Sequence, residues 1–255
     1  MDNIKRKNKG FWLTLALSIV IVTLACVAFL PTIFEKQTKT EAASAGSAMD
    51  SEAMRILSCC NAYLAANSFS TTMNGTVKAS VLGVPYTQKI HGGRTVDCAC
   101  GDFTDTAESK SALVKAAIKR ERRDGNYYVS RGEYNKKAFS YNAEQSLSKN
   151  GYLAQYGQPF TGIVKYNLEN TVISAKAVGA GVYKFVLDPA QSTLYSRNEV
   201  KTMLGGKSYP TYKGVEFTLV TDGDRPVKVT TREKFKIDKF GGTNCTAEYT
   251  EIFQF

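Results

Sequence analysis

Few residues in this chain have the types and spacing that catalysis requires. The 255 residues include one histidine, His91. A Ser-His-Asp or Cys-His mechanism would have to use it, because in both mechanisms the imidazole is the base that activates the nucleophile. His91 stands before two glycines in an expected turn, where a lone histidine is more often a surface residue than a base. The sequence therefore predicts no catalytic site, and we expect a binding protein instead of an enzyme.

Four carboxylates that follow one another closely are the remaining candidates for acid–base chemistry. They are Asp97, Asp102, Asp105 and Glu108. Paired carboxyl groups can act as general acid and general base when they are positioned at a reacting group. The segment around these four is polar, so we expect a loop in which their side chains are solvated.

Cysteines are the next group able to do chemistry. Cys26 lies in an apolar N-terminal run, which leaves an odd number elsewhere: Cys59, Cys60, Cys98, Cys100 and Cys245. The candidates for disulfide bonds are Cys59, Cys60, Cys98 and Cys100. Outside the cytoplasm thiols tend to oxidise, and one or two bridges between the CC pair and the CxC pair would fasten a helix to a strand. Each would contribute about 2–4 kcal/mol, but buried free thiols are the alternative and the pairing stays open.

A metal or cofactor site is not predicted. Structural zinc sites space their cysteines as C-x2-4-C, which vicinal CC and CxC pairs do not match. The GAG at residues 179–181 is too short for a phosphate-binding loop.

The apolar run over residues 11–34 predicts where in the cell the protein lies. It contains no charged residue. Its 24 residues would span roughly 36 Å as a helix, enough to cross a bilayer core of about 30 Å. Four Lys/Arg precede the run, so the positive-inside rule leaves the N-terminus in the cytoplasm. The sequence thus predicts a cytoplasmic tail (1–10), a transmembrane signal anchor (11–34), a polar tether (35–46) and an extracytoplasmic domain (47–255).

Two other interpretations of the N-terminal run stay open. The TLAC sequence that ends at Cys26 resembles a bacterial lipobox, which would place a lipid on that cysteine. The start of the run at Gly10-Phe11 resembles a type IV prepilin cleavage site, although Leu15 stands where that family has a glutamate. An uncleaved membrane helix with an incidental cysteine remains the preferred interpretation.

The charge favours an anionic neighbourhood. The chain has 33 Lys+Arg and 23 Asp+Glu, a net charge of +10. Without the four cations and Asp2 of the N-terminal tail, 29 minus 22 leaves +7 on the exported part. Such an excess suits lipid head groups or other envelope polymers. Nucleic acid is excluded as a partner, since an exported body would not meet it.

A helix and several strands are expected in the first half of the domain. Residues 50–67 place Ala53, Ile56, Leu57, Cys60, Tyr63 and Leu64 on one helical face, with Asp50 as a candidate N-cap. Residues 75–81 and 86–90 predict a hairpin, broken by the glycines after His91, and residues 95–100 predict another strand. Residues 109–123 have a helical composition and end at Asp124-Gly125, and residues 127–129 predict a short strand.

The second half shows clearer alternation. Residues 182–188 predict a strand, residues 188–204 a helix, and residues 215–221 with 227–237 a hairpin around DGDRP. A last strand over residues 246–255 is expected to close the sheet. Alternation gives an apolar inner face, and its candidate ligand-binding residues are Tyr183, Phe185, Leu187, Phe217, Leu219, Val229 and Phe235, while Lys228, Arg232, Lys234 and Lys236 point outward.

These elements predict an α+β domain: a curved antiparallel sheet, half-barrel-like, with helices packed on its inner face. In element order, and most closely over residues 217–235 (FTLVTDGDRPVKVTTREKF), the chain resembles the outer-membrane lipoprotein carrier superfamily (LolA/LppX-like). The resemblance implies a half-barrel whose concave apolar face holds acyl chains. Members of that family are usually lipid-anchored or soluble, whereas this chain has a candidate membrane helix.

Together these patterns predict a membrane-anchored extracytoplasmic protein that binds lipid, another hydrophobic ligand or a lipoprotein. The alternative is a structural or assembly protein of the cell envelope, pilin-like or otherwise an interaction domain, with an envelope protein as its partner. Cleavage at Gly10-Phe11 in the mature protein would distinguish the two.

Overall fold

A computed structural model describes residues 49–255, apart from 82, 112–114, 136–137, 143, 158, 167, 169, 198–209 and 239–241. The described residues belong to one compact unit. The expected tail, membrane anchor and tether lie outside them. None of the helices within the described ranges has the length and apolar character needed to cross a membrane.

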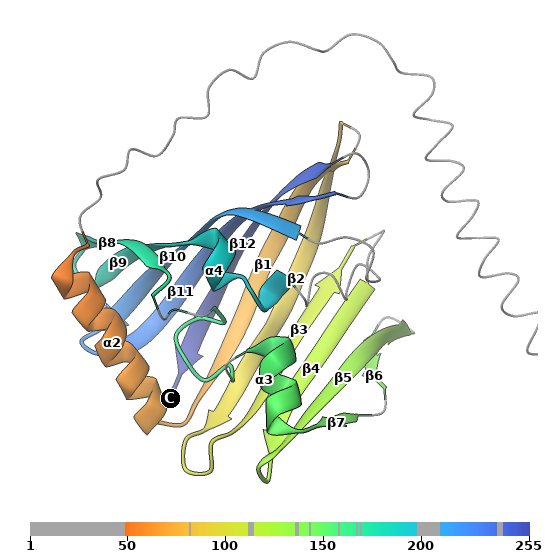
Figure 1. Cartoon of the computed structure of the whole chain (residues 1–255), viewed down its shortest axis with the longest axis horizontal. Helices are drawn as coiled ribbons and strands as arrows, with labels where there is room; N and C mark the ends of the chain where they lie inside the picture. The colour runs from red at the N-terminus through yellow and green to blue at the C-terminus, as the bar shows by residue number, and fades with distance from the viewer. Residues whose placement is uncertain are drawn as a thin grey trace, which may run out of the picture. The chain divides into compact units, whose positions relative to one another are not determined.

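A large curved antiparallel sheet dominates the domain (Figure 1) and is compatible with a half-barrel fold. Its twelve strands are β1 (Phe69–Val81), β2 (Val84–Asp97), β3 (Asp102–Lys110), β4 (Lys115–Arg123), β5 (Asn126–Asn135), β6 (Ala138–Tyr141), β7 (Gln145–Leu147), β8 (Val172–Gly179), β9 (Val182–Leu187), β10 (Pro210–Asp222), β11 (Arg225–Ile237) and β12 (Thr243–Gln254). Their order is β6-β5-β4-β3-β2-β1-β12-β11-β10-β9-β8, and β7 also pairs with β5. The last strand, expected to close the sheet, instead lies inside it between β1 and β11.

Helix α2 (Ser51–Ala66) confirms the predicted N-terminal helix. Asp50 caps it, because one carboxylate oxygen accepts hydrogen bonds from the amides of Glu52 (2.9 Å) and Ala53 (3.3 Å). The other carboxylate oxygen accepts from the amide of Ala177 (3.1 Å), and the Asp50 amide donates to the carbonyl of Ala175 (3.1 Å). Asp50 therefore joins the start of α2 to the free side of the edge strand β8.

The second half of the domain follows its predicted alternation. Strands β9, β10 and β11 cover the expected segments, and β10 and β11 pair as the predicted hairpin. The helix expected over residues 188–204 begins as α4 (Pro189–Ser192) but is interrupted by a turn at residues 193–195, and residues 198–204 lie outside the described ranges.

Three predictions for the first half were wrong. Residues 95–100 do not form another strand, because residues 95–97 end β2 and residues 98–100 form a turn. The helix expected over residues 109–123 does not form, because residues 109–110 end β3 and residues 115–123 are the strand β4. The glycines after His91 do not end the strand, since β2 continues through both of them. A Cβ atom on Gly92 would lie 2.2 Å from the carbonyl oxygen of Thr106, and one on Gly93 would lie 2.2 Å from that of Thr71. Neighbouring strands approach too closely there for any side chain, and glycine permits that approach.

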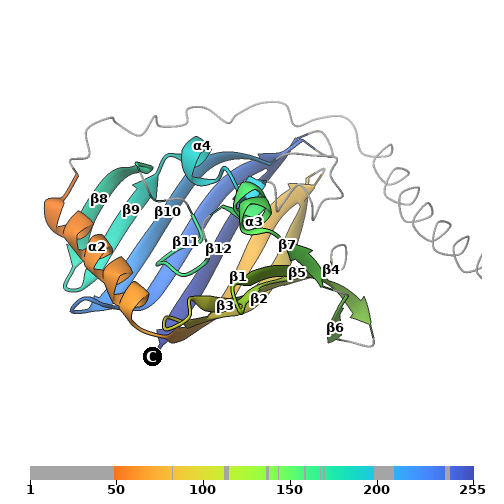
Figure 2. The same cartoon turned by 60° about the horizontal axis from the view of Figure 1, so that its bottom comes forward.

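The helices and a connecting segment cover one face of the sheet, its concave side (Figure 2). Helix α3 (Lys149–Tyr156) lies over the β3–β5 side, and α2 lies over the β8–β11 side. Residues 159–166 run between the two helices, and we call this segment the strap. Its side chains Phe160, Ile163, Val164 and Tyr166 are buried. The core lies between these segments and the sheet.

Candidate functional site

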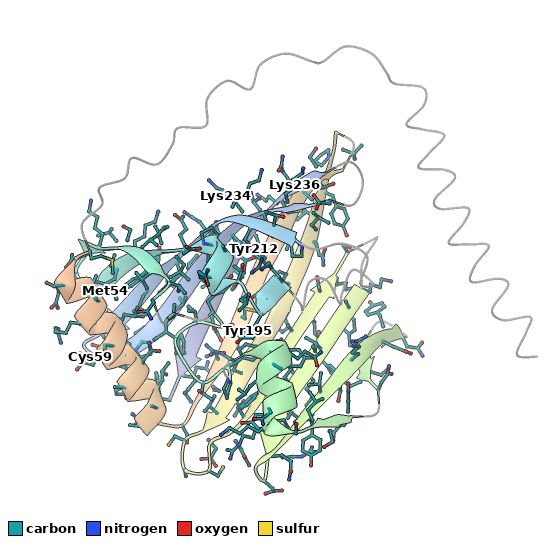
Figure 3. All side chains as sticks on the ribbon, viewed as in Figure 1. Met54, Cys59, Tyr195, Tyr212, Lys234 and Lys236 are labelled. Carbon is teal, nitrogen blue, oxygen red and sulfur yellow. The ribbon has the colours of Figure 1, made fainter. Side chains whose placement is uncertain are left out.

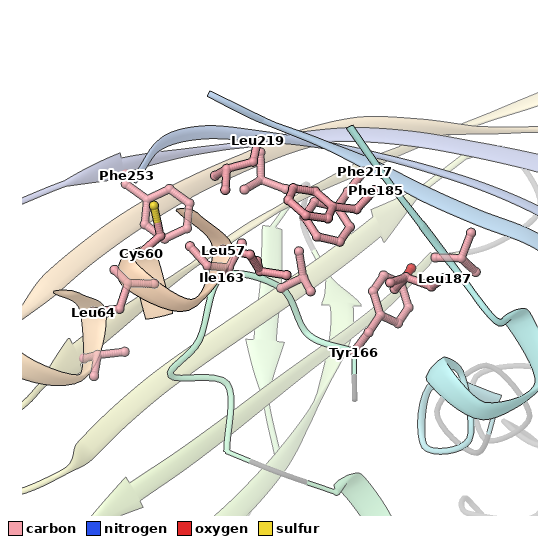
Figure 4. Packing of buried hydrophobic residues seen from close by; sticks show 14 of the residues in the cluster. Leu57, Cys60, Leu64, Ile163, Tyr166, Phe185, Leu187, Phe217, Leu219 and Phe253 are labelled. Atoms are coloured by element: carbon pink, nitrogen blue, oxygen red, sulfur yellow. The ribbon is translucent and has the colours of Figure 1, made fainter. Parts of the chain in front are cut away.

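The seven predicted inner-face residues are buried together in the core. The rings of Phe185 and Phe217 stack with centroids 4.8 Å apart on the neighbouring strands β9 and β10. Figure 4 shows Leu57 of α2 and Ile163 of the strap facing Leu219 and Phe217, and Cys60 of α2 beside Phe253. Alternation therefore placed these side chains on the correct face, where most of them pack against protein. Their contact with a ligand stays a prediction.

A cavity of about 220 Å³ lies beside this packed region on the same face. Of the seven predicted residues, Phe235 lines it. Apolar side chains from the sheet form much of its wall: Met73, Val77, Ile90, Ala107, Phe235, Ile237 and Ala247. Tyr195 and Tyr212 also line it and lie in front of the middle of the sheet in the view of Figure 3. Two groups of charged residues reach the wall from opposite halves of the sheet, and Glu108 of β3 lines it as well.

The first polar group, on β3 and β4, is an ion cluster around Asp105. The carboxylate of Asp105 is fully buried and pairs with Arg120, whose Nε lies 2.9 Å from Oδ2, and with the ammonium of Lys165 on the strap. Burial alone raises the pKa of the Asp105 carboxyl, but the charges of Arg120 and Lys165 outweigh it, so the pKa lies below its ordinary value. The Arg120 guanidinium also lies over the Phe160 ring, 4.4 Å from its centroid.

The second polar group is centred on Glu233 of β11. Its carboxylate accepts hydrogen bonds from the hydroxyls of Tyr249 (3.0 Å) and Tyr166, which is on the strap. Burial, reinforced by the charge of Glu233, raises the pKa of both tyrosines well above the ordinary value. Both hydroxyls therefore keep their protons and act as donors.

A buried arginine holds the strap over the cavity. Arg94 of β2 lies with its Nε 2.7 Å from Glu251 Oε1 of β12, and both side chains are buried. Its remaining nitrogens donate to the strap carbonyls of Phe160 (2.9 Å), Gly162 (2.8 Å) and Ile163 (3.4 Å). Among the described contacts, these hydrogen bonds of Arg94 are the main polar connection between the sheet and the strap.

The residues first considered for chemistry do not converge on a site. The Nδ1 of His91 lies 2.8 Å from Asn74 Oδ1 on the exposed face of β2, and not in a turn. The expected loop was wrong, because Asp97 ends β2 and the other three carboxylates lie on β3, and Asp105 is fully buried instead of solvated. Three or more His, Cys, Asp or Glu side chains do not gather into a metal-binding group anywhere in the described ranges.

The five cysteines after residue 49 are free thiols in this structure. Cys60 and Cys245 face the core, and burial raises their thiol pKa values to about 12 and about 11. Cys59 and Cys98 are partly exposed, and Cys98 lies in the turn after β2, where its sulfur accepts from the Ser68 hydroxyl (3.5 Å). The proposed pairing of the CC and CxC cysteines therefore stays a prediction.

Sequence reasoning missed the charged residues of the cavity wall, chiefly Arg120, Lys165 and Glu233, and two buried charges outside the wall, Arg94 and Asp105. Alternation could have identified β3 as a strand, since Phe103, Asp105 and Ala107 all face inward. The charged Asp105 at an inward position makes that alternation hard to recognise in the sequence. Comparison with models of known protein families, and a search among curated proteins, found no match for this chain.

Proposed function

We propose that this chain is a membrane-anchored, extracytoplasmic protein that binds a hydrophobic ligand, with lipid as the first candidate. The observation that carries the proposal is the cavity of about 220 Å³ on the concave face, with its largely apolar wall. A dry apolar cavity of roughly 150 Å³ is sufficient to take up benzene. Each Å² of apolar ligand surface removed from water would contribute about 25 cal/mol.

The placement at a membrane rests on the sequence and on the outer face of β11. Residues 11–34 form the apolar run described above. On β11 the side chains of Lys228, Arg232 and Lys234 are exposed and alternate with buried neighbours. A basic strand of this kind would favour an orientation toward anionic lipid head groups.

Native mass spectrometry of the full chain, released from detergent micelles, tests the proposal. We expect an additional mass that is lost on denaturation. The variant Ala107→Phe fills part of the cavity and should abolish that mass. The matched control is Ala99→Phe, which adds the same ring to an exposed turn residue and should keep it. Equal native and denatured masses for the wild-type chain would count against a bound ligand.

An envelope interaction domain is the second candidate, favoured by the edge strand β8. Ile173 and Val178 on β8 are 55% and 52% exposed. Exposed apolar side chains on an edge strand mark sites of association. A native mass of two or more chains, lost in the variant Ile173→Lys, would favour this function over ligand binding.

A further inference from the structure

One edge of the sheet carries a concentration of exposed apolar side chains. Among the described residues, seven large apolar side chains are exposed, and three of them, Met49, Ile173 and Val178, belong to the edge strand β8 or to the chain beside it. Met49 precedes Asp50, which is hydrogen bonded to the middle of β8, so its position along the strand falls between the other two. The start of α2 lies beside β8 in Figure 1. We call these three residues the edge patch.

Irregular pairing explains why two of these side chains are exposed. The register between β8 and β9 shifts twice, and Ile173 and Val178 are the two residues omitted from the pairing at those shifts. Bulges of this kind interrupt the ladder at sheet edges and redirect a side chain. Both apolar side chains are therefore displayed at the edge instead of being packed in the core.

The backbone of the same edge is poorly suited to bind another strand. The Asp50 carboxylate accepts from the amide of Ala177 (3.1 Å), and the Asp50 amide donates to the carbonyl of Ala175 (3.1 Å). An added strand would need these backbone groups, and the two bulges disturb the rest of the edge. A partner that contacts side chains without backbone hydrogen bonds, such as a lipid bilayer, therefore fits this edge better than a strand of a second chain.

The proposed anchor would hold this edge close to a membrane. Residues 35–48 link the apolar run to Met49. A random coil of that length has an end-to-end distance of about 20 Å. By comparison, β2 is six positions from β8 in the sheet, which is roughly 30 Å at the usual strand spacing. A short tether also gives a high effective concentration, so a small apolar patch is sufficient for contact.

The charged groups beside the edge patch suit phospholipid head groups. Lys176 of β8 is exposed, and exposed lysines near a bilayer attract anionic lipids. The two acidic residues at the start of α2 already have partners in the protein. Glu52 pairs with Arg55 (2.9 Å), and the carboxylate of Asp50 accepts backbone amides.

We propose that the edge patch is a membrane contact, in which Met49, Ile173 and Val178 insert between the head groups of the phospholipid bilayer that holds the anchor. This inference rests on the proposed membrane anchor and is independent of the cavity ligand. Surface contacts of this type bury apolar side chains about 5–10 Å into the boundary between head groups and acyl chains.

Fluorescence quenching by brominated lipid tests the contact. The chain contains one tryptophan, Trp12, in the expected anchor, so Trp12→Phe gives a background in which a new tryptophan reports on a single site. The full chain is placed in nanodiscs of phosphatidylcholine and phosphatidylglycerol, with or without bromine on the upper part of the acyl chains. We expect Val178→Trp and Ile173→Trp, each in this background, to lose as much fluorescence to brominated lipid as Trp12 does in the wild-type chain.

Val84→Trp is the matched control in the same background. Val84 is 65% exposed and lies on β2, so the same ring is added to an exposed apolar position away from the edge patch. Brominated lipid should leave its fluorescence unchanged. Ile173→Asp, added to the chain that carries Val178→Trp, should reduce the quenching at residue 178, whereas Val84→Asp should not.

The outcomes separate this inference from the anchor on which it rests. Quenching of Trp12 in the wild-type chain, without quenching at residues 173 and 178, would overturn the membrane contact and leave the anchor. Absence of quenching at Trp12 would overturn both. Blue-shifted emission at residues 173 and 178 that brominated lipid does not quench would overturn the contact in favour of association between chains. Equal quenching at residues 84 and 178 would overturn it too, because the domain would then have no preferred edge toward the bilayer.

Discussion

The two halves of the concave face are held together in different ways. On the β9–β11 half, apolar side chains such as Phe185, Phe217 and Leu219 pack against α2 and the strap. On the β2–β4 half, the largest fully buried side chains are Arg94 and Arg120. The cavity is lined from both halves, by Phe235 from the first and Arg120 from the second.

This difference separates stability from specificity. Apolar burial is non-directional and stabilises in proportion to the area removed from water. Buried ion pairs add little net stability, because desolvation offsets their attraction, but breaking one is costly. We infer that the apolar half supplies much of the driving force for folding. The charged half fixes where the strap lies, and hence the shape of the cavity.

Removal of one buried charge should give the largest effect. Arg94→Met leaves the Glu251 carboxylate buried without its cation and deprives the strap carbonyls of their donor. We expect a loss of about 3–5 kcal/mol in the free energy of unfolding. Urea unfolding of the full chain in detergent, followed by the near-ultraviolet circular dichroism of its tyrosines, measures it.

The double variant Arg94→Met/Glu251→Met is the control for that loss. Replacing both partners removes the uncompensated charge, so most of the stability should return. If the single and double variants are equally unstable, the packing of the arginine matters more than its charge, and the contrast between the two halves fails.

The apolar half should behave differently when one side chain is shortened. Leu219→Ala leaves a void in the packed core, and we expect a loss of about 3 kcal/mol. Ile173→Ala, at an exposed position of β8, should change stability by less than about 0.5 kcal/mol. The same urea titration serves for both. A loss below about 1 kcal/mol at Leu219 would show that this half is loosely packed.

The apolar half is also the half that the sequence predicted. Tyr183, Phe185 and Leu187 alternate with outward residues, and the turn at Asp222 follows directly from its DG sequence. Period-two alternation of apolar residues is sufficient to identify such strands and their inner face. It could not separate side chains that fill the core from those that line a cavity, because that distinction depends on which segments cover the sheet.

The charged half could not be predicted in the same way. Residues 115–123 (KAAIKRERR) are strong helix formers, so composition favoured a helix. The strand is fixed by tertiary pairing, in which Arg120 lies opposite Asp105, fifteen positions earlier. Lys165 joins them from the strap. The local sequence does not reveal these distant partners, and here tertiary contacts override the helix propensity of the segment.

Acid should open the charged half before the apolar half. The pKa of Asp105 is lower in the folded chain than in the unfolded one, so its contribution to stability is complete above the unfolded value of about 3.9. It is lost as the pH falls through the lower, folded value. Below about pH 4, hydrogen exchange corrected for intrinsic rates should therefore rise more in β3 and β4 than in β9 and β10.

Asp105→Asn is the control for the acid effect. The variant cannot titrate, so the difference in exchange between the two halves should no longer depend on pH, whatever the variant costs in stability. A uniform rise across both halves of the wild-type sheet would mean that acid acts through the net charge of the whole domain instead of this carboxyl.

The smallest effect is expected at the edge of the apolar half. Asp50→Ala removes the N-cap of α2 and the acceptor of the Ala177 amide, so exchange should accelerate at the start of α2 and along β8. Asp188→Ala is a matched control, because Asp188 caps the short α4 through the amides of Ala190 and Gln191. Faster exchange in β8 for Asp50→Ala alone would show that the Asp50 carboxylate protects a strand edge as well as a helix end. Equal exchange in β8 for the two variants would confine its role to capping, and leave the protection of that edge to the packing of α2.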